Sequence, residues 1–184
     1  MAPAASIVDI AWAAVPPGSP RRDHAWRLLA ELLPAGADLE NPCPRCGGPH
    51  GPVVVARAPF VASVTYAGGY AIAAVAATRD AAALGIDAEP ELDARRDAAG
   101  MTGVLGDGDA TVRDWVRVEA TLKADGRGLR VEPATVDVVP AADGWTAAVP
   151  DGDVYTGWDV PGPPGILVSV AVLSRESPGA SPTA

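Results

Sequence analysis

Apolar runs of strand length recur along the chain, separated by turns rich in glycine, proline and aspartate. Short apolar runs bounded by such turn signals are typical of β-strands. Gly68-Gly69, Asp143-Gly144 and Asp151-Gly152 suit the tight turns of β-hairpins. The pattern predicts strands at Ile7–Val15, Val53–Arg57, Val61–Tyr66, Tyr70–Thr78, Leu84–Pro90, Leu129–Val131, Val136–Val139, Trp145–Val149, Val154–Asp159 and Ile166–Leu173.

Helical periodicity is limited to a few segments. Asp23–Leu33 carries its apolar residues on one side and is followed by Pro34, which predicts an amphipathic helix. Val112–Asp125 is predicted as a second helix, with Thr111 as N-cap and glycine directly after it. The remaining segments are predicted as a loop at Ala35–Pro52, a short helix at Leu92–Ala99, a loop at Gly100–Asp109 and an unstructured tail at Ser174–Ala184.

Glu119 and Lys123 follow Trp115 at intervals of four residues, so the three share one stripe of the second helix. A surface ion pair, worth about 0.2–0.5 kcal/mol, is the ordinary interpretation of this spacing. However, Lys123 is the only lysine among 14 basic residues, and arginine serves everywhere else. A compact ammonium is not replaceable by a planar guanidinium. The composition therefore favours a chemical role for Lys123, whereas Trp115 is expected to pack.

A pair of carboxylates precedes this helix. In an extended strand, Asp87 and Glu89 project from the same face. Adjacent carboxylates repel one another unless a cation relieves the repulsion, and Mg²⁺ prefers oxygen ligands. The spacing is consistent with a magnesium site that Glu119 completes, or with two solvated acids at the end of a strand.

Together these segments carry a family resemblance. Gly-Ile-Asp-x-Glu, followed by Trp-x-x-x-Glu-Ala-x-x-Lys-x-x-Gly-x-Gly-Leu, resembles the signature of 4'-phosphopantetheinyl transferases of the Sfp type. Cys43–Gly51 and Ser63–Gly69 also resemble segments of that family, and the similarity runs from Trp26 to Leu173. The matching signature residues are Gly85, Ile86, Asp87, Glu89, Trp115, Glu119, Ala120, Lys123, Gly126, Gly128 and Leu129.

The resemblance implies an α+β fold of two similar α/β halves, related by a pseudo-twofold axis, with the active site in the cleft between them. Residues 1–84 would form the N-terminal half, residues 85–173 the C-terminal half with the metal and catalytic motifs, and residues 174–184 a disordered tail. A faint internal repeat agrees with this division. Ile7–Ala11 followed by the Ala25–Leu33 helix resembles Leu84–Ala88 followed by the Trp115–Leu122 helix.

The resemblance also implies a reaction. The enzyme would move the phosphopantetheine arm of coenzyme A onto a serine of an acyl, peptidyl or polyketide carrier protein and release 3',5'-ADP. Glu119 would act as general base, and Lys123 would bind the pyrophosphate and protonate the leaving phosphate. Mg²⁺ would be held by Asp87, Glu89 and Glu119, and coenzyme A would also contact Thr65, Tyr66 and Arg57.

The chain departs from the family pattern where cations usually bind coenzyme A. Val118 replaces a lysine, Tyr66 a histidine and Trp26 an arginine, and Gly51-Pro52 lacks the lysine of Gly-Lys-Pro. Arg57 is one of the arginines that would compensate. The alternatives are a catalytically weak or inactive relative that only binds a carrier protein or coenzyme A, and an unrelated small α/β or metal-binding module.

Charge and hydropathy exclude several classes of partner. The net charge is −9, and no basic run exists, which argues against nucleic acid and anionic membranes. No apolar run approaches the roughly 20 residues of a membrane span, and the N-terminus lacks the basic start of a signal peptide. We therefore expect a cytoplasmic protein, and we expect a monomer because the two halves that the resemblance implies would already complete one cleft.

Both cysteines lie in one Cys-x-x-Cys, Cys43 and Cys46, with His50 four residues later. A tight turn that merely contains cysteines, a metal site and a redox pair are all compatible with this spacing. The only other histidine that a metal site could recruit is His24.

Overall fold

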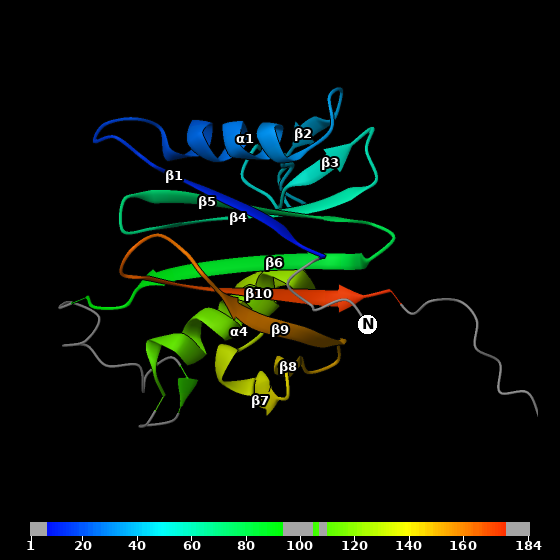
Figure 1. Cartoon of the computed structure of the whole chain (residues 1–184). Helices are drawn as coiled ribbons and strands as arrows, with labels where there is room; N and C mark the ends of the chain where they lie inside the picture. Colours follow the sequence, from blue (N-terminus) through cyan, green and yellow to red (C-terminus); the bar gives the residue numbers. More distant parts are fainter. Residues whose placement is uncertain (1–6, 94–104, 107–109, 176–184) are drawn as a thin grey trace, which may run out of the picture.

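The computed structural model describes residues 7–93, 105–106 and 110–175. Among these residues the strands form three β-sheets and two α-helices are assigned, in the arrangement shown in Figure 1. The helices are α1 (Arg21–Leu32) and α4 (Val112–Asp125), and two 3₁₀ turns, η2 (Gly128–Arg130) and η3 (Pro133–Thr135), follow α4. The strands are β1 (Asp9–Ala14), β2 (Asp38–Glu40), β3 (Val54–Ala56), β4 (Phe60–Ala67), β5 (Tyr70–Ala77), β6 (Ala81–Pro90), β7 (Asp137–Ala141), β8 (Gly144–Ala148), β9 (Val154–Val160) and β10 (Ile166–Ser174).

The expectation of two similar α/β halves with a pseudo-twofold axis is wrong, because the described fold is mostly β. The sheets differ in size and order: β1-β5-β4, β2-β3 and β6-β10-β9-β8-β7. Every strand pairing among the described residues is antiparallel. Antiparallel neighbours need only short turns between them, whereas parallel α/β units need a crossover helix. Among the described residues, α1 and α4 contribute 12 and 14 residues. The faint strand–helix repeat of the sequence does not extend to two similar halves.

Strand β5 forms the centre of the three-stranded sheet and is apolar on both faces. Ala71, Ala73 and Val75 face α1 and pack against Ala25 and Leu29. The alternate residues Ile72, Ala74 and Ala76 belong to a second core, shared with β6, β9 and β10. Because successive strand residues point to opposite faces, the alanine-rich β5 packs between a helix and another sheet.

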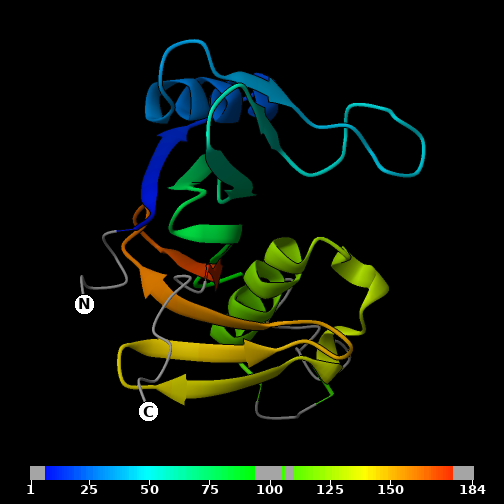
Figure 2. The same cartoon turned by 90° about the vertical axis from the view of Figure 1, so that its right-hand side faces the viewer.

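Helix α4 covers the other face of the five-stranded sheet, as Figure 2 shows. Its buried residues Val118 and Leu122 pack with Trp145 and Tyr155 of β8 and β9. At Gly85 of β6, a Cβ atom would overlap the backbone carbonyl oxygen of Ala120. The glycine therefore allows the backbone of α4 to lie directly on β6, beside the acidic end of that strand.

The two larger sheets meet where β4 lies beside β6. The backbone N–H of Ile86 donates to Ser63 Oγ over 3.2 Å, and Thr65 Oγ1 donates to Asp87 Oδ1 over 3.1 Å. Both hydrogen bonds are buried, so side chains of β4 join the two sheets at this point. The boundary expected near residue 84 falls inside β6, and the division into residues 1–84 and 85–173 stays a prediction.

Several sequence-based expectations can be compared with individual elements. The bounds of α4 and its capping box of Thr111 and Asp114 are confirmed. The strand expected at Leu129–Val131 is wrong, because Gly128–Arg130 forms a 3₁₀ turn. The expected loop Ala35–Pro52 contains the short strand β2. Most of the expected helix at 92–99, most of the expected loop at 100–109 and the tail beyond residue 175 lie outside the described residues. None of the helices described is long and apolar enough to cross a membrane.

Candidate functional site

Lys123, on the last turn of α4, reaches across to the acidic end of β6. Its Nζ donates to Asp87 Oδ1 over 2.6 Å and to the backbone oxygen of Ile86 over 3.1 Å. Thr65 of β4 donates to the same carboxylate. The side chain of Asp87 is only 8% exposed, and that of Lys123 is 31% exposed. Three elements distant in sequence thus converge on one buried carboxylate.

Glu119 lies one helical turn before Lys123 and is half buried. Burial raises the pKa of its carboxyl group, and the negative charges of Asp87 and Glu89 raise this pKa further, while Lys123 opposes them. Glu119 therefore shares one electrostatic environment with all three residues. A carboxylate with a raised pKa is a better proton acceptor near neutral pH than an ordinary one.

The fit of Asp87, Glu89 and Glu119 to a divalent cation is mixed. Their mutual repulsion is the condition that a cation relieves. However, within the described chain these carboxylates do not form a set whose ligand atoms lie within 4.8 Å of one another, and the Lys123 ammonium binds Asp87. The oxygen donors suit Mg²⁺ chemically, and their convergence on an ion requires side-chain rotation.

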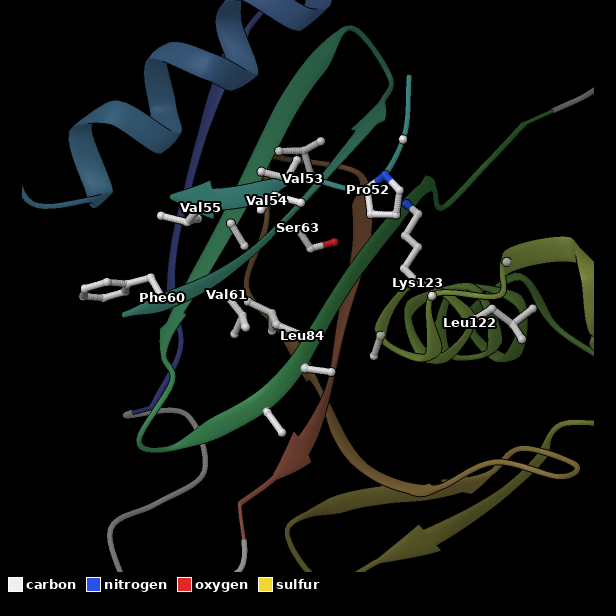
Figure 3. Close-up of a pocket in the computed structure, with 18 of the residues that line it drawn as sticks. Pro52, Val53, Val54, Val55, Phe60, Val61, Ser63, Leu84, Leu122 and Lys123 are labelled. Atoms are coloured by element: carbon white, nitrogen blue, oxygen red, sulfur yellow. The ribbon is translucent and has the colours of Figure 1, made fainter. Parts of the chain in front are cut away.

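A cavity of about 600 Å³ lies beside α4, and Figure 3 shows Lys123 at its edge. Strands β3, β4 and β6, the end of α4 and the segment before β3 surround it. Its lining is mostly aliphatic, including Val54, Val61, Leu84 and Leu122, and Ser63 contributes a hydroxyl. Among the described lining residues, Lys123 is the one that carries a fixed charge, so an anionic group in this cavity would approach Lys123.

Thr65, Tyr66 and Arg57, expected to contact coenzyme A, lie in three different environments. Thr65 is buried against Asp87, whereas Tyr66 has the Arg21 guanidinium 4.7 Å above its ring centre. Arg57 is exposed and forms an ion pair of 3.1 Å with Asp38. None of these three residues is among the described lining residues of the Lys123 cavity. Their role in binding coenzyme A remains a prediction.

The structure gives physical reasons for two departures from the family pattern. Val118 is 3% exposed in the core between α4 and β8, where an unpaired lysine would be costly to bury. Trp26 of α1 is partly buried against the core between α1 and β5, and the Arg22 guanidinium lies 4.7 Å from its ring centre. Both residues serve packing rather than anion binding.

Sequence reasoning missed the ion-pair network that fixes the outer side of α4. Arg113 and Arg117 both donate to Asp159 of β9, each over 2.8 Å, and Ser169 of β10 donates over 2.7 Å. Burial alone would raise the pKa of Asp159, but these hydrogen bonds outweigh it and lower the pKa to about 2. The spacing of the two arginines, one helical turn apart, was the available signal. The network holds α4 in position on the sheet.

A second cluster lies in the segment between β2 and β3. The two cysteine sulfurs and a ring nitrogen of His50 all lie within 4.8 Å of one another, which makes Cys43, Cys46 and His50 a possible metal-binding group. Both cysteines are free. Backbone amides of Arg45 and Cys46 hydrogen-bond the Cys43 sulfur and lower the pKa of its thiol.

Comparison with known proteins gives no assignment: no protein-family model matches the chain, and no curated protein shows significant sequence similarity to it.

Proposed function

We propose that this protein transfers the phosphopantetheine arm of coenzyme A to a serine of a carrier protein. The observation that carries the proposal is the position of Lys123, the chain's only lysine, which contacts buried Asp87 and also borders the cavity. The resemblance to Sfp-type transferases assigns both residues to the same site.

The cavity supports binding of a long ligand that ends in a phosphate. Its aliphatic walls suit the pantetheine chain, and the Lys123 ammonium suits the pyrophosphate. An ammonium has three N–H donors, and two of them contact Asp87 and Ile86. The third can donate to an oxygen of the substrate.

In the proposed reaction the serine oxygen attacks the β-phosphorus of coenzyme A and forms a new P–O bond. The bond to the bridging oxygen breaks, and 3',5'-ADP leaves. Glu119 accepts the serine proton as general base. Lys123 neutralises charge on the leaving phosphate and supplies a proton to it. Asp87 holds the ammonium in place, and Thr65 in turn holds the Asp87 carboxylate.

Mg²⁺, held by Asp87, Glu89 and Glu119, would neutralise the pyrophosphate oxygens when bound. The chain itself keeps these three acids beside the Lys123 ammonium. Helix α4, which carries Glu119 and Lys123, is held on the sheet by its close packing at Gly85 and by the hydrogen bonds to Asp159.

The direct test is intact-mass spectrometry of apo carrier proteins incubated with the protein, coenzyme A and Mg²⁺. A mass gain of one phosphopantetheine arm is expected, with loss of the gain in EDTA and in Glu119→Gln. Glu132→Gln is the matched control, because Glu132 is exposed at the start of η3. Coenzyme A binding without transfer to carriers of the fatty-acid, polyketide, peptide and siderophore classes would instead favour a relative that only binds.

A further inference from the structure

Cys43, Cys46 and His50 bring three metal-binding side chains together, and one distance between their donor atoms matches an edge of a tetrahedral zinc site. Cys46 Sγ lies 3.5 Å from His50 Nε2. With zinc bonds of about 2.3 Å to sulfur and about 2.0 Å to nitrogen, the sulfur–nitrogen edge of a tetrahedral site is about 3.5 Å. The two cysteines form no disulfide, and the two sulfurs and the ring nitrogen all lie within 4.8 Å of one another. The three donor atoms are therefore close enough together to share one ion.

The backbone of this turn is already closed around the cysteines. Gly47 N–H donates to the Cys43 oxygen, and Cys43 N–H donates to the Gly48 oxygen, each over 2.8 Å. Gly47 has a φ of 72°, which favours glycine. A Cβ atom at Gly48 would lie 3.2 Å from the His50 ring and 3.3 Å from Cys46 Sγ. The two glycines thus let the turn close and leave room around the donor atoms.

The base of the loop is also fixed. Arg22 of α1 donates to the Pro49 oxygen over 2.6 Å and contacts the side-chain oxygen of Asn41. Asn41 Nδ2 donates to the same Pro49 oxygen over 2.9 Å, and Gly51 N–H donates to the Asn41 oxygen over 2.8 Å. The donor set is therefore presented by a loop whose two ends are tied to each other and to a helix.

The two competing interpretations explain fewer of these features. A turn that merely contains cysteines does not require His50 to fold back onto Cys46. A redox Cys-x-x-Cys usually begins a helix, whereas the described chain continues here as a loop and then as strand β3. Two thiols and one imidazole are donors that zinc prefers.

We propose that Cys43, Cys46 and His50 bind one Zn²⁺, with water in the fourth position, and that the ion stabilises this loop as a wall of the Lys123 cavity. His50, Gly51 and Pro52 line the cavity directly, so ordering of the loop shapes one side of it. The zinc site does not depend on the proposed transferase activity, and its test needs no substrate.

The first measurement is the zinc content of the full chain, loaded with ZnCl₂ under reducing conditions and freed of excess metal. One equivalent is expected for the wild type and near zero for Cys43→Ser/Cys46→Ser. His24→Ala is the matched control, because the imidazole of His24 contacts Ser19 Oγ over 2.7 Å outside the cluster. Absence of zinc from the loaded wild type, or an unchanged zinc content in the double variant, would overturn the proposal.

The second measurement reports the coordination geometry of the bound metal ion. Co²⁺ in place of zinc should give the intense visible absorption of a tetrahedral thiolate site, and His50→Ala should shift this absorption. A weak octahedral spectrum would contradict the assignment.

Trypsin cleavage after Arg45, which is exposed within the turn, should slow by about tenfold or more with zinc bound, because local opening becomes rarer. Equal cleavage with and without zinc would contradict ordering of the loop.

Discussion

The Lys123 ammonium lies 2.6 Å from the Asp87 carboxylate, although 36 residues separate them in the chain. Replacement of Lys123 by Ala should leave buried Asp87 with only Thr65 as partner and cost about 1–3 kcal/mol of stability. Under the proposed mechanism, Lys123→Ala should also lower transfer at least about 100-fold. Denaturant unfolding and carrier-protein mass shift measure the two effects.

Lys123→Arg separates charge from shape. A guanidinium retains the positive charge and can still pair with Asp87, so most of the stability should return. The planar group cannot supply a proton to a leaving phosphate, so transfer should stay low. Full activity in Lys123→Arg would show that Lys123 contributes charge alone.

Glu119 should make stability depend on pH in a defined direction. Its folded-state pKa is raised above the ordinary value of 4.5, so the folded protein binds this proton more tightly than the unfolded chain does. Glu119 ionisation therefore lowers stability as pH rises through the window above 4.5. Glu119→Gln should be more stable than the wild type at pH 7, and the difference should shrink as pH falls through that window.

Thermal unfolding of both proteins between pH 4 and pH 8 would measure this difference, with Glu132→Gln as the exposed control. A cation bound by these acids should raise the melting temperature of the wild type at pH 7 and have less effect on Glu119→Gln. A Glu119→Gln variant that is less stable than the wild type across the whole range would contradict this account of the site.

Asp159 should show the opposite pH dependence. Its pKa is lowered from 3.8 to about 2, so its contribution to stability is present above pH 4 and is lost as pH falls toward 2. This shift corresponds to about 2 kcal/mol at neutral pH. Asp159→Asn should lose about that amount at pH 7 and differ little from the wild type near pH 2, as measured by denaturant unfolding at each pH.

Gly85 should tolerate no side chain. A Cβ atom there would overlap the backbone of Ala120, which cannot rotate away as a flexible side chain can. Gly85→Ala should therefore displace α4 from β6 and destabilise the protein by about 1–3 kcal/mol. Ala82→Ser, on the exposed side of the same strand, is the control and should unfold like the wild type.

The cavity can be tested at Val54, which is 46% exposed on β3 and lines it. Val54→Trp should obstruct the cavity and weaken coenzyme A binding, with little change in stability because the site is at the surface. Val139→Trp on β7 is matched in exposure, at 47%, and lies outside the cavity lining. Isothermal titration should show weaker binding only for Val54→Trp, and equal affinity of both variants would exclude this cavity as the coenzyme A site.

The local sequence pattern determined much of the secondary structure of this protein. The strands follow apolar runs between turn residues, and the caps of α4 follow from Thr111, Asp114 and Gly126. The stripe of Glu119 and Lys123 follows from helical periodicity alone, because residues four apart lie on one side of a helix.

Only the tertiary structure decided which elements lie together, because the periodicity of apolar residues within a segment does not specify its partners elsewhere in the chain. Only the packing of α4 on Gly85 brings Lys123 to Asp87, and only the pairing order of the sheets shows that the fold is mostly β rather than two similar α/β halves. The loop of Cys43 and His50 illustrates the same limit. Its spacing allowed three interpretations, and only the folded backbone brings the sulfurs and the imidazole within reach of one ion.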